Sequence, residues 1–368
     1  MNRRPLLLPI VSALGLATVV LSAQTPVTPP PGDSIVLVTI DGARTEEVFG
    51  GLDADVLRST MKPEQTLESS PTYQRYWAAS REERRRRLMP FLWQLVSDEG
   101  SIAGDRASGS SVRLRNTLWF SYPGYAEILL GEPHDAEISS NDPIRNPYVT
   151  VLEAIRDKLK LPSEKVATFA SWEVFNEIAE HRAGSTTINA GYEASGRADA
   201  EGQLLDRLQM EARTPWASAR HDAFTFRFAM SHLEKARPRA LYIAFDETDD
   251  WAHDGRYDLV LDSYARIDAY LRELWTWLQS QPDYRGRTHL LVTTDHGRGA
   301  TVADWRTHGA KAEGSQHVWI AFASPRLTQR GVWHDAPELT TSQIAATLAG
   351  WMGVDWVADH PAAGRPIQ

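Results

Sequence analysis

Aspartate and histidine residues in this sequence occur in a pattern that could bind metal ions. Asp41 ends the apolar run Ser-Ile-Val-Leu-Val-Thr-Ile, Asp295 and His296 follow Thr-His-Leu-Leu-Val-Thr-Thr, and Asp249 precedes His253 by four residues. Carboxylate oxygens and imidazole nitrogens, without thiolates, suit zinc, with manganese as an alternative. A single Asp after a strand is more often a helix cap. The joint occurrence of two Asp/His pairs favours two divalent metal ions.

Ser121 is the candidate nucleophile. It opens the segment Ser-Tyr-Pro-Gly-Tyr-Ala-Glu-Ile-Leu-Leu-Gly. A serine hydroxyl is a poor nucleophile at neutral pH, and a metal ion can activate it. At the start of a helix the same turn would add backbone N–H groups for an anion. The alternative is that Ser121 only caps that helix, with Pro123 at an early helical position.

Neighbouring acidic residues compete with Asp249 as the ligand in its segment. Asp246 and Asp250 flank it in Asp-Glu-Thr-Asp-Asp-Trp-Ala-His. The spacing of four residues to His253 favours Asp249, because side chains at i and i+4 meet on one face of a helix.

Strand and helix patterns alternate along the chain and would position these residues. Continuous apolar runs predict strands covered on both faces, and apolar residues at steps of three and four predict helices between them. This alternation predicts an α/β fold with a doubly wound, mostly parallel sheet, helices on both faces and small cap insertions. The predicted strands are 35–40, 166–170, 240–245, 289–294 and 318–323. The predicted helices are 150–159, 221–235, 260–278 and 342–351, and the candidate insertions are 46–80, 132–148 and 180–215.

In an open sheet of this kind, ligands bind beyond the carboxyl ends of the strands. Asp41, the segment of Asp249 and the pair Asp295 and His296 each follow a predicted strand. We therefore expect these three segments to converge in space.

Composition excludes several classes of protein. The chain has 368 residues, 42% of them hydrophobic, a net charge of −9 and no cysteine. Its acidity argues against a nucleic-acid partner. The lack of cysteine excludes disulfides, thiolate metal sites and a cysteine nucleophile.

The first residues are typical of an export signal. Arg3 and Arg4 precede a mostly apolar run to Leu21, and Leu-Ser-Ala precedes Gln24. The run of about 16 residues is short for a membrane span, which is the alternative. We expect a signal peptide over 1–23, a Pro-rich linker over 24–33 and a catalytic domain over 34–368. The mature protein would then be secreted or periplasmic, without stable membrane association, and its oligomeric state stays open.

Five motifs, in order, resemble those of the alkaline phosphatase superfamily. They are the strand ending in Asp41-Gly42, the nucleophile turn from Ser121 to Gly131, Asp249-x-x-x-His253 with Ala252 where Gly is usual, Thr294-Asp295-His296-Gly297, and His308-Gly309 before a predicted strand. Each motif alone is weak, but five in the family's order are specific.

The resemblance implies which residues hold each metal ion. One ion would be held by Asp249, His253 and His308, and the other by the remaining three ligands, Asp41, Asp295 and His296. The hydroxyl of Ser121 would lie at or between the ions. His317 competes with His308, and the family position of His-Gly favours His308.

The resemblance also implies the reaction. The exported protein would hydrolyse small-molecule phosphate esters, with monoesters favoured. A phosphodiesterase or nucleotide-pyrophosphatase-like enzyme is the first alternative. A sulfatase is disfavoured because Tyr125 replaces the arginine of the sulfatase turn and His308 replaces a lysine. A catalytically inactive metal-binding relative is the last alternative. Arg44, Arg298 and Arg306 lie near the motifs and are candidates for phosphate binding.

Overall fold

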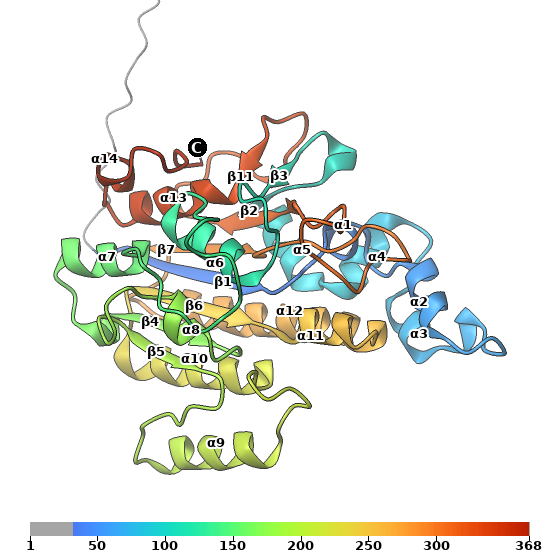
Figure 1. Cartoon of the computed structure of the whole chain (residues 1–368), viewed down its shortest axis with the longest axis horizontal. Helices are drawn as coiled ribbons and strands as arrows, with labels where there is room; N and C mark the ends of the chain where they lie inside the picture. The colour runs from blue at the N-terminus through green and yellow to red at the C-terminus, as the bar shows by residue number, and fades with distance from the viewer. Residues whose placement is uncertain (1–31, 368) are drawn as a thin grey trace, which may run out of the picture.

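A central strand with parallel neighbours on both sides organises the fold. The computed structural model describes residues 32–367. Strand β1 (Ser34–Ile40) pairs in parallel with β6 (Ala240–Phe245) on one side and with β7 (Thr288–Thr293) on the other. These three strands form the middle of an eight-stranded sheet (Figure 1). The carboxyl ends of β1, β6 and β7 therefore lie at the same edge of the sheet.

The remaining strands extend this sheet on both sides and add a small second sheet. The order of the large sheet is β10 (Gly331–Val332), β2 (Gly100–Ala103), β9 (Ile320–Ala323), β7, β1, β6, β4 (Val166–Ala170) and β5 (Thr187–Ala190). Strand β9 runs antiparallel to both of its neighbours, and the other paired strands of this sheet are parallel. The second sheet has the order β11 (Leu339–Thr340), β3 (Val112–Arg113) and β8 (His317–Val318).

Both faces of the large sheet are buried under helices. Alternate residues of β1 enter separate hydrophobic cores, Val36 and Val38 on one face and Ile35 and Leu37 on the other. The first core receives α5 (Pro90–Asp98), α10 (Asp222–Ala236) and α12 (Tyr257–Ser280), and the second receives α6 (Ser121–Leu130), α7 (Val151–Leu159) and α13 (Ile344–Trp351) (Figure 1). The predicted doubly wound α/β fold is confirmed.

Shorter helices complete the described chain. The first core also includes residues of α1 (Thr45–Gly50), α2 (Ala54–Thr60), α3 (Pro71–Tyr76) and α4 (Arg81–Leu88), and the second includes residues of α8 (Phe175–Ile178) and α14 (Trp356–Asp359). The other two are α9 (Ala200–Glu211) and α11 (Glu247–His253). Within residues 32–367, no helix combines the length and apolar character needed to cross a bilayer. The predicted signal peptide and most of the predicted linker lie outside the described residues.

The predicted elements agree with the structure except at three places. The run 318–323 is not one strand, because it divides at Trp319 between β8 of the small sheet and β9 of the large one. The insertion predicted at 180–215 contains β5, which is an edge strand of the large sheet, and α9. The insertion predicted at 46–80 is largely helical and contributes side chains such as Val56 to the core.

Candidate metal centre

The candidate ligands follow three adjacent strands. Asp41 comes directly after β1, Asp249 and His253 lie on α11 after β6, and Asp295 and His296 come shortly after β7. Because the order of these strands is β7-β1-β6, the three segments meet at one sheet edge, as expected. Their ligand atoms form two compact groups, each held within 4.8 Å.

Asp41, Asp295 and His296 form the first group, and all three residues are buried. The Nε2 of His296 lies 3.4 Å from Asp41 Oδ1 and 3.4 Å from Asp295 Oδ2. The Nδ1 of His296 donates to the carbonyl oxygen of Gly297 at 2.7 Å, which directs Nε2 to the carboxylates. Asp41 Oδ1 and Asp295 Oδ2 are buried oxygens that no described hydrogen-bond donor satisfies. Such oxygens are costly unless they meet a cation or a donor, so the group fits a metal ion.

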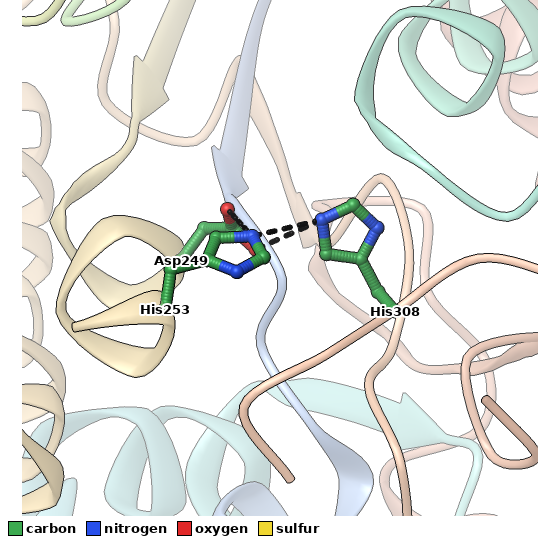
Figure 2. Close-up of side chains that lie close together, drawn as sticks. All are labelled: Asp249, His253 and His308. Carbon is green, nitrogen blue, oxygen red and sulfur yellow. Dashed lines mark hydrogen bonds and ion pairs between the residues drawn. The ribbon is translucent and has the colours of Figure 1, made fainter. Parts of the chain in front are cut away.

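Asp249, His253 and His308 form the second group, which faces a cavity. The Nε2 of His253 lies 3.1 Å from Asp249 Oδ2 and 3.0 Å from His308 Nε2. Figure 2 shows both imidazole rings turned toward the carboxylate of Asp249. Two neutral imidazole nitrogens this close repel unless a proton or a cation lies between them. This group therefore also fits a divalent ion.

Asp249 lies between the two groups, and Ser121 lies beside the first. Asp249 Oδ1 lies 3.9 Å from His296 Nε2 and 3.9 Å from His308 Nε2. The hydroxyl of Ser121 lies 3.4 Å from His296 Nε2. The structure thus brings together all seven predicted site residues, and the role of each as ligand or nucleophile stays a prediction.

The charges of the site are unbalanced without cations. Burial raises the pKa of Asp41, and the neighbouring Asp249 adds to the increase. Burial and the charge of Asp41 likewise raise the pKa of Asp295. Burial also lowers the pKa of His308 to about 2, helped by His296, so this imidazole is neutral and able to bind metal.

Asp249 behaves differently from the other two carboxylates. Burial opposes its ionisation, but the charge of Arg298 holds the pKa of Asp249 well below its usual range. Its Oδ1 forms an ion pair with Arg298, whose remaining N–H groups donate to the carbonyl oxygens of Trp305 and Arg306. Asp249 is thus ionised and held in place.

The nucleophile turn is strained before the helix begins. Trp119 has a φ of 54°, which is unfavourable for a residue with a side chain, and Asn116 holds it through two hydrogen bonds of 2.9 Å. Phe120 is the N-cap of α6, and Ser121 is the first helical residue. Ser121 is therefore not the capping residue of this helix.

The helix N-terminus offers fewer backbone donors than the sequence suggested. The N–H of Tyr122 donates to Asn141 Oδ1 at 2.9 Å, and Pro123 has no N–H. The N–H of Gly124 already donates to Phe120 at 3.0 Å. Of the first four helical residues, only Ser121 keeps an N–H without a partner among the described residues.

Two glycines permit the close packing of the site. Gly42 has a φ of 59°, and a Cβ there would lie 2.4 Å from Asp249 Oδ1. A Cβ on Gly124 would lie 2.2 Å from the carbonyl oxygen of Asp295. These approaches place the helix of Ser121 directly against the segment that carries Asp295.

Tyr125 and Asp222 hold ligand-bearing elements in place, and sequence reasoning missed both roles. The hydroxyl of Tyr125 donates to Asp41 Oδ2 at 2.8 Å, leaving Oδ1 free. The carboxylate of Asp222 accepts the backbone N–H groups of Asp246 at 2.9 Å and Glu247 at 3.3 Å, at the start of α11. Burial, with the charge of Glu247, raises the pKa of Asp222 to about 7.

None of the three arginines suggested for phosphate binding lines the cavity. Arg44 is buried and forms an ion pair with Glu47. Arg298 is engaged by Asp249, and Arg306 is exposed and packs over Gly255. His317 lies in β8, opposite Arg113, and belongs to neither ligand group in the described chain.

A cavity of about 220 Å³ opens onto the second ligand group. Its lining includes no lysine or arginine of the described chain. Sequence reasoning did not assign Asn141, Trp172 or Ser218 to the site, because they lie in irregular segments without a motif. The lining residues are Asp41, Ser121, Asn141, Trp172, Ser218, Ala219, Asp246, Asp249, Asp250, His253 and His308.

Comparison with known proteins shows the fold and no sequence-level relative. No protein-family model and no curated protein sequence matches the chain. Alkaline phosphatase PafA is similar in structure, with a TM-score of 0.60 and 11% identity over 92% of this chain and 99% of that one.

Two further similar structures come from proteins with different activities. The lipoteichoic acid synthase LtaP from Listeria monocytogenes has a TM-score of 0.54 and 10% identity, covering 88% of this chain and 72% of that one. BT1596, a 2-O GAG sulfatase, has a TM-score of 0.50 and 13% identity, covering 88% and 71%. The chain shares its fold with these three proteins, and the resemblance drawn from the motifs is confirmed at the level of the fold.

Proposed function

We propose that this chain is a dimetal hydrolase of phosphate esters in which Ser121 is the nucleophile. The observation that carries the proposal is the pair of three-residue ligand groups beside one serine hydroxyl. Five of the six ligand side chains follow three strand ends, and His308 completes the second group from an irregular segment, whereas an inactive relative would not need both groups intact.

Ser121 and Asn141 would have different roles in the proposed reaction. Ser121 Oγ faces the cavity from the first turn of α6, where it can attack a phosphorus atom bound there. When bound, two divalent ions would favour the alkoxide of Ser121 and neutralise phosphate oxygens. Asn141 lies at the same cavity and can donate its amide N–H groups to the phosphate, since its Oδ1 is already occupied by Tyr122.

A phosphodiester is the second candidate substrate, and one observation favours it. A monoester dianion needs more positive charge than a diester monoanion, yet no described lysine or arginine lines the cavity. The fold does not choose between phosphate and sulfate, because its structural neighbours include a phosphatase and a sulfatase. The phosphate preference rests on Tyr125 and His308, which stand where sulfatases carry arginine and lysine.

The test compares zinc-loaded wild type with Ser121→Ala on an aryl phosphate monoester, the diester and the aryl sulfate. The wild type should hold two zinc ions per chain and hydrolyse a phosphate ester faster than the sulfate. Ser121→Ala should keep both ions and lose about a hundredfold or more in kcat. Unchanged kcat in a fully metallated Ser121→Ala would refute the nucleophile, and a higher kcat/KM for the sulfate would refute the substrate class.

We further propose that the protein is exported and acts on small molecules outside the cytoplasm. The charged and apolar pattern of residues 1–23 supports this. Fractionation of cells expressing the full chain, with N-terminal sequencing of the product, should recover a protein that begins near Gln24. Recovery of the intact chain in the cytoplasm would refute export.

A further inference from the structure

Two acidic residues at the cavity have no role in the proposed chemistry. Asp246 is the N-cap residue of α11, and Asp250 lies one turn further along the same helix. Both line the cavity next to Asp249, yet neither belongs to a ligand group of the described chain. They add negative charge to a site whose proposed substrate is itself an anion.

The carboxylate of Asp246 lacks a cationic partner. Its residue is only 8% exposed, and its side chain faces the cavity. Within residues 32–367 no ion pair and no hydrogen bond from an N–H or a hydroxyl reaches the carboxylate of either Asp246 or Asp250, and both residues line the cavity. Two neighbouring carboxylates without a donor or counter-ion are suited to a cation that enters the cavity.

An aromatic ring and a hydroxyl contribute to the same cavity. The half-buried Trp172 lines it, and an isolated β-bridge to Ala219 holds the Trp172 backbone. The face of an indole ring attracts ammonium groups, most strongly when they are desolvated. Ser218 is next to Ala219 and also lines the cavity. A carboxylate pair beside an indole is suited to an organic ammonium group, because the carboxylates balance its charge and the indole face attracts it.

We infer that the cavity binds the ammonium group of a phosphate ester whose alcohol carries a short aminoalkyl chain, with Asp246 and Asp250 as its counter-ions and Trp172 as one wall. This inference rests on the proposed function, which places the phosphate beside Ser121. The ammonium group balances the charge of two carboxylates that belong to neither ligand group. The volume of about 220 Å³ is below the usual range for drug-sized ligands, which limits the substrate to a small ester or to the head of a larger one.

Matched esters test the inference through activity. Zinc-loaded protein is assayed with 2-aminoethyl phosphate and with propyl phosphate, which differ by an ammonium group in place of a methyl group. The wild type should prefer the aminoalkyl ester by about tenfold or more in kcat/KM, because charge-assisted hydrogen bonds to the carboxylates form only with that ester. Asp246→Asn and Asp250→Asn should each reduce this ratio toward one.

A matched control separates local from general charge effects. Asp258→Asn removes the same charge from α12, where the side chain is 40% exposed and pairs with Arg256 outside the cavity. This variant should keep the wild-type ratio. If it lowers the ratio as much as Asp246→Asn does, the preference is a property of overall charge, and the inference fails.

Binding without turnover distinguishes failure of the inference from failure of the proposed function. The non-hydrolysable 3-aminopropylphosphonate and butylphosphonate are titrated into zinc-loaded protein by calorimetry. Tighter binding of 3-aminopropylphosphonate in the wild type, with loss of this preference in Asp246→Asn, supports the ammonium subsite even if no ester is hydrolysed. The absence of hydrolysis would then refute only the proposed reaction. Equal affinity of the wild type for both phosphonates would overturn the ammonium site. A third zinc ion that is present in the wild type and absent from Asp246→Asn would also overturn it.

Discussion

The hydrogen bond from Tyr125 to Asp41 should control metal affinity more than it controls folding. Tyr125 is 1% exposed, and its hydroxyl donates to Asp41 Oδ2 at 2.8 Å, while Asp41 Oδ1 has no partner in the described chain. Tyr125→Phe removes this donor and leaves the ring in place. With metal bound, Asp41 is ionised, so Tyr125→Phe removes a hydrogen bond to a charged carboxylate. Such a hydrogen bond contributes about 1.5–3 kcal/mol.

The cost differs between the metal-loaded and metal-free protein. Without metal, burial raises the pKa of Asp41 and favours its neutral form, for which a lost hydrogen bond costs only about 1 kcal/mol. The difference between these costs corresponds to a loss of about tenfold in zinc affinity at the group of Asp41, since each 1.4 kcal/mol or so is a factor of ten. Groups that orient metal ligands typically contribute effects of about 10–100-fold.

The assay combines zinc competition titrations with urea unfolding in the presence and absence of zinc. Tyr242→Phe is the matched control, because Tyr242 is equally buried and its hydroxyl contacts Thr39 Oγ1 at 3.0 Å rather than a candidate ligand. The control should lose the same stability with and without zinc and keep its zinc affinity. If Tyr125→Phe also keeps its zinc affinity, and is destabilised equally in both states, the argument is wrong.

Three further predictions follow from other contacts. His308→Ala should empty one zinc site while His317→Ala keeps both, as read from anomalous zinc density; the reverse result would exchange their roles. Glu127→Gln should lower the free energy of unfolding in urea by about 2–4 kcal/mol. The buried carboxylate accepts hydrogen bonds from five donor groups, including the hydroxyls of Thr341 at 2.6 Å and Ser342 at 2.7 Å, and the amide would turn a donor toward them. A loss below about 1 kcal/mol would contradict this. Burial lowers the pKa of His289 from 6.5 to about 4. Between these two pH values the unfolded chain binds a proton at His289 that the folded chain does not. The free energy of unfolding should therefore fall by up to about 3 kcal/mol as the pH drops from 6.5 to about 4. In His289→Gln this part of the pH dependence should vanish, and an unchanged slope would show that other groups cause it.

Much of the fold could be predicted because the central strands are buried on both faces. Such strands appear as continuous apolar runs, and 166–170 and 240–245 coincide with β4 and β6. The helix at 150–159 could be located because Thr150 and Glu153 form a capping box, a local interaction that the sequence carries. Short edge strands lack this signal. Strand β5 has only four residues, two of them polar, and its pairing depends on β4.

The convergence of five candidate ligands could be predicted from secondary structure, because Asp249 and His253 share a helix face and Asp41, Asp295 and His296 follow strands that lie side by side. The inclusion of His308 and the division into two groups came from the family resemblance. The division at Trp319 was not predictable, because Val318 and Ile320 pair in different sheets. Nor was the role of Tyr125, which depends on packing of α6 against the end of β1 rather than on a local pattern.

The cavity wall and the ligand groups are carried by different parts of the chain. Asn141, Trp172 and Ser218 lie outside the strands and helices of the described chain, whereas five of the six candidate ligands lie on α11 or directly beyond the ends of β1 and β7. Loops tolerate sequence change better than the elements they connect. Mutations in the wall should therefore alter which ester is accepted without dismantling the centre. These three positions could be randomised together, and variants could be selected that accept new substrates while their zinc content stays unchanged.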